Sequence, residues 1–192
     1  MAKLIGIIGM PGTGKTTMMR EWMAMREWSE DTPIKLLNTH VSSGIRLFGK
    51  YAEGDVYAGT DKLSMAVQPA AIEYLKGDPS PINVFEGDRL TTLTFFEEAV
   101  RLGHDVTIIE LTVDDATREQ RYRDRGSEQS DTFVNGRRTK VRNITNRFSG
   151  SPLDEDEPNI VETYNHETPE DTKVIIARLE QLVLAAALST TN

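Results

Sequence analysis

Short runs of apolar residues alternate along the chain with longer stretches in which apolar residues recur every three to four positions. The first pattern is typical of buried strands, and the second is typical of helices that bury one face. The runs that predict strands are 3–8, 34–37, 82–85, 106–111 and 160–164. Because these five strands alternate with helices, we expect an α/β fold, with a mostly parallel five-stranded sheet covered by helices on both faces.

The predicted helices are marked by their periodicity and by the residues at their ends. They are 14–28, 63–76, 92–102, a helix that begins near Asp114, and a last helix from Thr168 to about Leu188. One of the two aspartates at 114–115 stands in a capping position, and Pro169 lies in a first turn, where proline is favoured. The stretch 40–61 is rich in glycine and polar residues, and within it only 45–51 and 56–58 suggest a hairpin.

Composition excludes several classes of protein. The 192 residues show no internal repeat and no linker, so we expect a single domain over 1–192. The absence of cysteine excludes a disulfide scaffold and thiolate metal sites. No apolar run approaches the roughly 20 residues of a membrane helix, and PGTGKTT follows the apolar start where a signal peptide would be cleaved. We therefore expect no membrane partner and a cytoplasmic location.

Charge is unevenly distributed along the chain. Lys and Arg number 22 against 30 Asp and Glu, which gives a net charge of −8. Residues 118–147 nevertheless carry nine basic and four acidic residues, and residues 148–172 carry eight acidic residues and no Lys or Arg. An acidic protein does not bind polyanions over its whole surface, but one cationic segment is able to serve a phosphate-bearing ligand.

Residues 9–16 read G-M-P-G-T-G-K-T and match the phosphate-loop pattern G-x-x-x-x-G-K-S/T between a predicted strand and a predicted helix. Glycines let the loop fold tightly, so that backbone N–H groups and the helix N-terminus surround phosphate oxygens. Lys15 is then within reach of the β- and γ-phosphates, and the Thr16 hydroxyl is placed to bind Mg²⁺. We therefore expect ATP and Mg²⁺ as cofactors, held by Gly9, Gly12, Thr13, Gly14, Lys15, Thr16 and Thr17.

A second group of polar residues follows the third predicted strand. Glu86, Asp88 and Arg89 come directly after the apolar run 82–85. Ligands of open α/β sheets bind beyond the carboxyl ends of the strands, so these side chains are expected to face the phosphate loop. We expect Glu86 to orient Mg²⁺, Asp88 to accept the proton of an attacking hydroxyl, and Arg89 to hold an acceptor phosphate. The alternative is a strand-end turn with solvated charges.

An arginine-rich segment follows the fourth predicted strand. Arg118, Arg121 and Arg125 recur at spacings of three and four, so they share one helix face. Few acidic residues lie between them, and the row therefore suits a triphosphate better than it suits helix stabilisation. We interpret 118–147 as a lid that closes and excludes water, with Arg121 and Arg125 as catalytic residues. The alternative is a solvated surface.

The phosphate loop, the sequence E-G-D-R at 86–89 and the arginine-rich lid together resemble P-loop kinases of the nucleotide and polynucleotide kinase type. The resemblance implies a strand order of 2-3-1-4-5, a lid over ATP, and a late loop at 164–168, with Asn165, beside the adenine. It also implies a catalytic aspartate after the second strand, the place that Asp61 occupies here. Asp61 is equally suited to cap a helix, and both Asp61 and Asp88 are candidates for the general base.

More narrowly, residues 57–69 and 85–90 look like bacteriophage kinases of thymine hypermodification, which phosphorylate 5-hydroxymethyluracil within DNA. This resemblance implies transfer of the γ-phosphate of ATP to the hydroxymethyl group of that base. The partner is then DNA, and the location of a phage-encoded protein is the host cytoplasm. The acceptor is expected to bind over about 40–68 and at the end of the third strand. The residues expected to contact it are Arg46, Tyr57, Asp61, Gln68 and Arg89, with Phe48 and Tyr51 as further stacking platforms.

Two other functions stay open. A deoxynucleoside monophosphate kinase would use the same ATP site with a small acceptor, although the chain lacks the D-G-F-P-R of adenylate kinases and a plain thymidylate kinase signature. The other is a nucleotide-dependent ATPase or switch module that moves partners without transferring phosphate to them. The chain has no N-K-x-D signature of GTPases, and a lid in the same chain favours a self-contained kinase.

Overall fold

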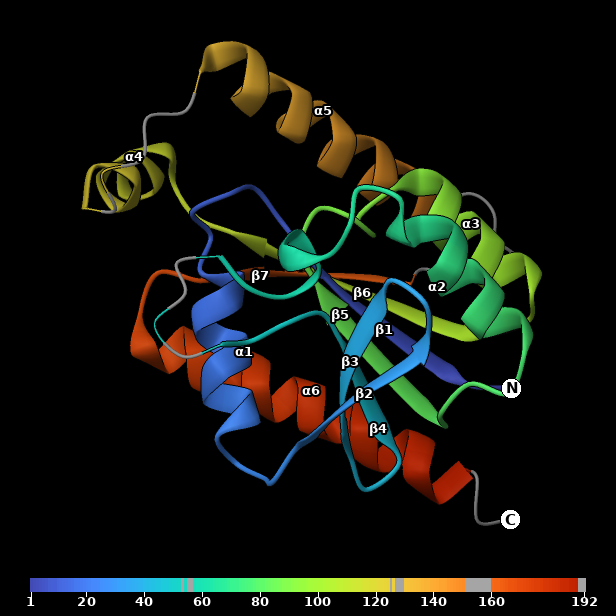
Figure 1. The fold of residues 1–192 in the computed structure, drawn as a ribbon. Coiled ribbons are helices and arrows are strands. Elements are labelled where there is room, and N and C mark those ends of the chain that lie inside the picture. Colours follow the sequence, from blue (N-terminus) through green and yellow to red (C-terminus); the bar gives the residue numbers. More distant parts are fainter. Residues whose placement is uncertain (53, 55–56, 125, 127–129, 151–159, 190–192) are drawn as a thin grey trace.

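The computed structural model of the protein describes residues 1–189 apart from 53, 55–56, 125, 127–129 and 151–159. A central sheet separates two layers of helices (Figure 1). The strands are β1 (Lys3–Ile8), β2 (Ser29–Ile34), β3 (Leu37–Ser42), β4 (Ile45–Phe48), β5 (Ile82–Glu86), β6 (Asp105–Thr112) and β7 (Val161–Asn165). The helices are α1 (Lys15–Met23), α2 (Val67–Lys76), α3 (Leu93–Arg101), α4 (Asp115–Asp124), α5 (Asp131–Phe148) and α6 (Pro169–Ser189), with a 3-10 turn η1 (Thr60–Lys62). The expected α/β fold is confirmed.

The sheet has seven strands in the order β2-β3-β4-β5-β1-β6-β7, and the prediction of five strands was wrong. From β4 to β7 all neighbours are parallel and follow the order 2-3-1-4-5, with β4 as the second strand. β2 and β3 extend this sheet as antiparallel strands. No single strand covers 34–37, as was predicted: Ile34 ends β2, Leu37 begins β3, and residues 35 and 36 form the turn between them, where Leu36 has a φ of 78°.

The antiparallel extension explains why the strands between residues 29 and 48 differ from the predicted ones. β2 has the sequence SEDTPI and is exposed along nearly its whole length, so it has none of the apolar pattern that marks a strand. β3 and β4 are joined by Ser43 and Gly44, whose φ angles are 46° and 81°. A two-residue turn with positive φ at both positions matches the twist of paired strands, so these residues close a tight hairpin.

The two helical layers pack on opposite faces of β1, all six residues of which are buried. Leu4 and Ile8 belong to a core shared with α2, α3 and α5, whereas Ile5 and Ile7 belong to a core shared with α1 and α6. This alternation follows from the two-residue period of a strand that is buried on both sides. The carboxyl ends of β1 and β5 therefore open at the same edge of the sheet, below α4 and α5 (Figure 1).

Three helices differ from the prediction. α2 begins at Val67 rather than at residue 63. α1 ends at Met23 rather than at residue 28, because the chain leaves it to form β2 from Ser29 onward. α5 occupies 18 residues for which no helix was predicted, and Ser130 caps it by accepting a hydrogen bond from the Phe133 N–H at 3.3 Å. Within the described ranges, no helix combines the length and apolar character that crossing a membrane requires.

Candidate active site

The phosphate loop connects β1 to α1 and depends on three glycines with positive φ, at 142° for Gly9, 84° for Gly12 and 87° for Gly14. A Cβ on Gly9 would lie 2.4 Å from the Leu111 carbonyl oxygen, and a Cβ on Gly14 would lie 2.6 Å from Cε1 of His166. A side chain at either position would therefore both strain the backbone and collide with its neighbours. Close packing against the end of β6 and the loop after β7 defines the shape of this loop.

Lys15 and Thr16 begin α1 at the mouth of the loop. The Lys15 ammonium donates hydrogen bonds to the carbonyls of Gly9 at 2.9 Å and Met10 at 3.0 Å. The Thr16 hydroxyl donates to Oε1 of Glu86, the last residue of β5, at 3.1 Å. Hydroxyl and carboxylate oxygens are the ligands that Mg²⁺ prefers, so Thr16 and Glu86 fit the ion that accompanies ATP.

Glu86 is a buried carboxylate, 1 % exposed. Burial raises the pKa of its carboxyl to about 7, and the nearby charge of Asp61 acts in the same direction, while Lys15 opposes both. Burial also raises the pKa of the Tyr51 hydroxyl, and the Glu86 carboxylate beside it adds to that rise. A carboxylate that is costly to keep charged in isolation is stabilised by a cation, which agrees with the expected place of Mg²⁺.

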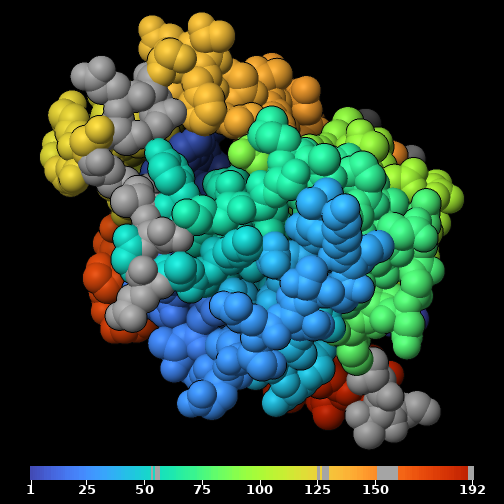
Figure 2. Space-filling view, in the orientation of Figure 1, coloured from blue at the N-terminus to red at the C-terminus, as the bar shows by residue number. Residues whose placement is uncertain are grey.

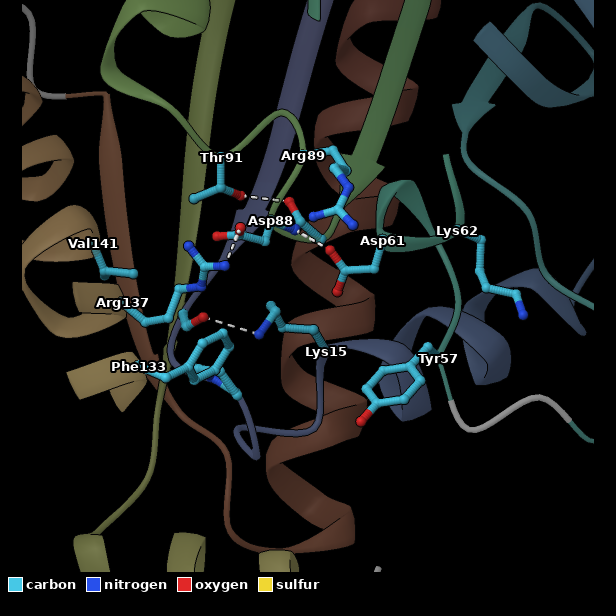
Figure 3. Close-up of a pocket in the computed structure, with 13 residues that line it drawn as sticks. Lys15, Tyr57, Asp61, Lys62, Asp88, Arg89, Thr91, Phe133, Arg137 and Val141 are labelled. Carbon is cyan, nitrogen blue, oxygen red and sulfur yellow. Dashed lines mark hydrogen bonds and ion pairs between the residues drawn. The ribbon is translucent and has the colours of Figure 1, made fainter. Parts of the chain in front are cut away.

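The two aspartates proposed as general base lie side by side but have different partners. Asp61, in η1, accepts a hydrogen bond from the backbone N–H of Asp88 at 2.6 Å. Both carboxylate oxygens of Asp88 face α5: Oδ1 lies 2.8 Å from the Lys140 ammonium and Oδ2 lies 2.8 Å from the Arg137 guanidinium. Asp88 therefore ties the end of β5 to α5, while Asp61 borders the space in front of the phosphate loop (Figure 3).

This space is a cavity of about 470 Å³ between the phosphate loop, η1, the end of β5 and α5. It is lined by Gly9, Pro11, Lys15, Tyr57, Asp61, Lys62, Gly87, Asp88, Arg89, Thr91, Phe133, Arg137 and Val141. Tyr57 and Phe133 lie on opposite sides of Lys15 (Figure 3) and are 59 % and 38 % exposed. The cavity thus joins the phosphate loop to a site with aromatic side chains on two of its walls.

Sequence reasoning did not find the α5 residues of this cavity. Phe133, Arg137 and Val141 are spaced by four, so they lie on one face of the helix. The Arg137 guanidinium stacks over the Phe133 ring, 4.7 Å from its centroid. The same four-residue spacing in the sequence was the available signal, but the segment was assigned only to the lid over 118–147, without a helix.

Arg121 lies on α4 against the phosphate loop, but its guanidinium contacts backbone carbonyls. It donates to the Gly12 oxygen at 3.1 Å, to the His166 oxygen at 3.1 Å and to the Glu167 oxygen at 3.3 Å. The Tyr122 hydroxyl donates to the Pro11 oxygen at 2.7 Å. α4 therefore holds the phosphate loop and the loop after β7 together. Arg125, the other catalytic arginine expected of the lid, lies outside the described residues.

The loop after β7 reaches the phosphate loop through His166, which the sequence did not single out. Its Nδ1 lies 2.6 Å from the Thr13 oxygen and its Nε2 lies 2.8 Å from the Thr172 hydroxyl. Asn165, the neighbouring residue at the end of β7, is exposed next to this contact. The late loop is thus close to the place where a nucleotide would lie on the phosphate loop.

The remaining predicted acceptor residues are dispersed. Tyr57, Asp61 and Arg89 line the cavity, but Arg46 and Gln68 do not. The Arg46 guanidinium pairs with Asp31 across β3 at 2.6 Å, and the Gln68 carbonyl accepts from the Thr92 hydroxyl at 2.8 Å. Phe48, the last residue of β4, is fully buried in the hydrophobic core, so its expected role as a stacking platform was wrong.

Comparisons with known proteins identify a family for the chain. The sequence model of the family described as P-loop Nucleotide Kinase3 matches residues 1–181. Among solved structures, the chain is similar to a gluconokinase from Sinorhizobium meliloti 1021, with 11 % identity, 96 % of this chain and 97 % of that chain covered, and a TM-score of 0.48. No curated protein matches the chain. The protein belongs to the P-loop Nucleotide Kinase3 family, for which ATP-dependent phosphoryl transfer is the activity implied.

Proposed function

We propose that this kinase transfers the γ-phosphoryl group of ATP to the hydroxymethyl group of 5-hydroxymethyluracil in DNA. The observation that carries the proposal is the cavity in front of the phosphate loop, which Lys15, Asp61 and two exposed aromatic side chains, Tyr57 and Phe133, share. A planar base is the ligand that such aromatic walls suit, and a hydroxyl on it would face the γ-phosphate.

The donor half of the reaction rests on the phosphate loop. Its backbone N–H groups would hold the phosphates, and the Lys15 ammonium would leave the loop carbonyls for the β- and γ-phosphate oxygens. Thr16 and Glu86 would hold Mg²⁺, which neutralises charge on those phosphates when it is bound. Arg121, by bonding Gly12 and His166, would keep the loop shaped for the nucleotide.

Asp61 is the better candidate for the general base. Both carboxylate oxygens of Asp88 are already paired, one with Lys140 and the other with Arg137, so neither is free to accept the proton of an attacking hydroxyl. Asp61 is oriented by the Asp88 N–H through one oxygen, and its other oxygen points into the cavity (Figure 3). Asp61 would take the proton of the acceptor hydroxyl while the hydroxyl oxygen forms a bond to the γ-phosphorus and the bond between that phosphorus and ADP breaks.

One observation is compatible with the second candidate, a deoxynucleoside monophosphate kinase, as well as with the first. The Nε atoms of Arg89 and Arg137 are buried at the cavity without a partner among the described residues. A phosphate would satisfy such guanidinium donors as a bidentate ligand. That phosphate is either the 5′-phosphate of a free nucleotide or the one that flanks the base in a strand, so the contact suits both acceptors.

Radiolabelled ATP separates the candidates. We would offer it with an oligonucleotide that contains one 5-hydroxymethyluracil, with the same oligonucleotide carrying thymine, and with free deoxynucleoside monophosphates. We expect label only in the modified oligonucleotide, because thymine has no acceptor hydroxyl at that position. Efficient labelling of free nucleotides without label in modified DNA would instead establish the second candidate. Release of free phosphate alone would leave an ATPase.

A further inference from the structure

Helix α5 carries a charge opposite to that of the rest of the protein. Five basic residues against Asp131 give it a net charge of +4, so the remainder of the chain carries −12. After Asp131, residues 132–148 include no acidic residue, although the whole chain has 30. Acidic neighbours at i+3 or i+4 are what would stabilise these cations within the helix, so helix stability does not explain their grouping.

The side chains of α5 divide between two faces. The inner face carries Phe133, Arg137 and Val141 to the cavity, and its lower end packs into the core through Ile144 and Phe148. The opposite face consists of residues that are all exposed and recur at spacings of three and four: Asn135, Arg138, Thr139, Arg142, Asn143 and Asn146. We call these six residues the outer face of α5. They are cations and neutral hydrogen-bonding groups, and the one acidic residue on the same side of the helix is the exposed Asp131, four residues before Asn135 in the first turn.

Contacts within the protein leave this face largely unused. Arg138 approaches Asp115 of α4 at 3.6 Å with both side chains more than half exposed, a pair that contributes little. Arg142 makes no ion pair or side-chain hydrogen bond with any described residue. The exposed cations are therefore available to a ligand outside the chain.

We propose that the outer face of α5 binds the phosphate backbone of the DNA strand whose base enters the cavity; this rests on the acceptor proposed above. Arginine pairs with phosphate oxygens as a bidentate donor, and asparagine and threonine side chains are common partners of the same oxygens. At 1.5 Å per residue, an 18-residue helix is about 27 Å long, long enough to follow several successive phosphates.

The position of the helix supports a single strand as the occupant. In the space-filling view α5 forms a ridge at the upper edge of the molecule, above a hollow in which residues near the N-terminus are visible (Figure 2). Arg137 lines the cavity, and the next residue, Arg138, belongs to the outer face. A strand that follows the ridge would thus hold its phosphates outside while one base leaves the stack for the aromatic walls beneath.

The test removes two charges from the ridge and compares this with the same loss elsewhere. The first variant is Arg138→Gln with Arg142→Gln. The matched control is Lys76→Gln with Lys173→Gln, which removes two exposed cations from α2 and α6. Anisotropy of a fluorescein-labelled single strand that contains one 5-hydroxymethyluracil gives the association constant over a range of NaCl concentrations. Thermal unfolding checks that both variants fold like the parent protein.

We expect the logarithm of the association constant to fall linearly with the logarithm of salt, and the slope to be shallower by about 0.7 for each arginine removed. The control pair should keep the parent slope. An unchanged slope in the arginine variant, an equal change in the control pair, or no binding of the strand by the parent protein would each overturn the proposal.

Label transfer, measured in parallel on the parent protein, distinguishes failure of this proposal from failure of the acceptor. If only free nucleotides are labelled while the slope depends on the two arginines, the strand-binding face stands and the acceptor is wrong. If modified DNA is labelled while the slope is unchanged, the acceptor stands and the face is wrong.

Discussion

The two sides of the cavity are built in different ways. On the donor side the phosphate loop is formed by backbone: three glycines with positive φ, and carbonyls that hold Lys15 and Arg121. On the acceptor side the walls are side chains, from η1, the end of β5 and α5. The residues that form the phosphate loop are contiguous in the chain, whereas those that form the second side are far apart in it.

The two sides therefore differ in how far their residues can be substituted. A Cβ on Gly9 or Gly14 would collide with atoms of β6 or of the loop after β7, so the donor side tolerates little change. Tyr57 and Phe133 are exposed, and their exchange for other side chains would leave the backbone in place. We infer that the phosphate loop sets the donor chemistry, and that the side chains opposite it set the acceptor.

The largest effect is expected from the group that the proposal assigns to the phosphates. Lys15→Ala should fold normally, because its ammonium bonds partly buried loop carbonyls rather than the core, but kcat should fall on the order of 10³-fold. Turnover and thermal unfolding would be measured together. A folded variant with nearly normal turnover would mean that the donor side has been wrongly assigned.

The acceptor side has a matched pair of aspartates. Asp61→Asn should lower kcat by about 10²- to 10³-fold without weakening strand binding, because only the proton acceptor is lost. Asp88→Asn should lower kcat less and raise KM for the acceptor, since it releases Arg137 and Lys140 of α5 from the end of β5. Both constants would be compared in one assay. The opposite ranking would assign the base to Asp88.

The aromatic walls should affect the acceptor without affecting ATP. Tyr57→Ala and Phe133→Ala should each raise KM for modified DNA on the order of tenfold or more, because a base–aromatic stack contributes about 1–3 kcal/mol. KM for ATP should be unchanged. Val174→Ala, at an exposed apolar side chain of α6, serves as the control. An equal rise in both KM values would show that the walls do not belong to the acceptor side alone.

The smallest effect concerns stability and contrasts two glycines of similar φ, 87° at Gly14 and 81° at Gly44. A Cβ on Gly44 would meet no atom within 4 Å, so Gly44→Ala should cost only the conformational strain, about 1 kcal/mol. Gly14→Ala adds the collision with His166 and should cost at least about 2 kcal/mol. Urea unfolding measures both; equal losses would show that packing does not constrain the loop.

Much of the donor side was predictable because it is local. The apolar run of β1, the glycines of the phosphate loop and the start of α1 lie within residues 3–23, and the loop pattern needs no distant residue to be recognised. The parallel core order followed from the family resemblance, and the structure confirms it from β4 to β7. Neither β2 nor α5 was predicted. β2 is polar, and α5 has few apolar residues, so it lacks the clear apolar face that predicts a helix.

The acceptor side was decided by tertiary structure. Asp61 and Asp88 are 27 residues apart, and Asp88 and Lys140 are 52 apart, so their contacts exist only because the sheet order brings η1, β5 and α5 to one edge. The sequence offered both aspartates as candidate bases without ranking them, Asp88 from its place after the third predicted strand and Asp61 from the family resemblance. The proposed ranking rests on α5, whose cations pair with the Asp88 carboxylate and leave that of Asp61 facing the cavity. By itself the sequence determined that a phosphate loop is present; the packing of distant elements decided what lies opposite it, because side chains acquire neighbours only when the chain is folded.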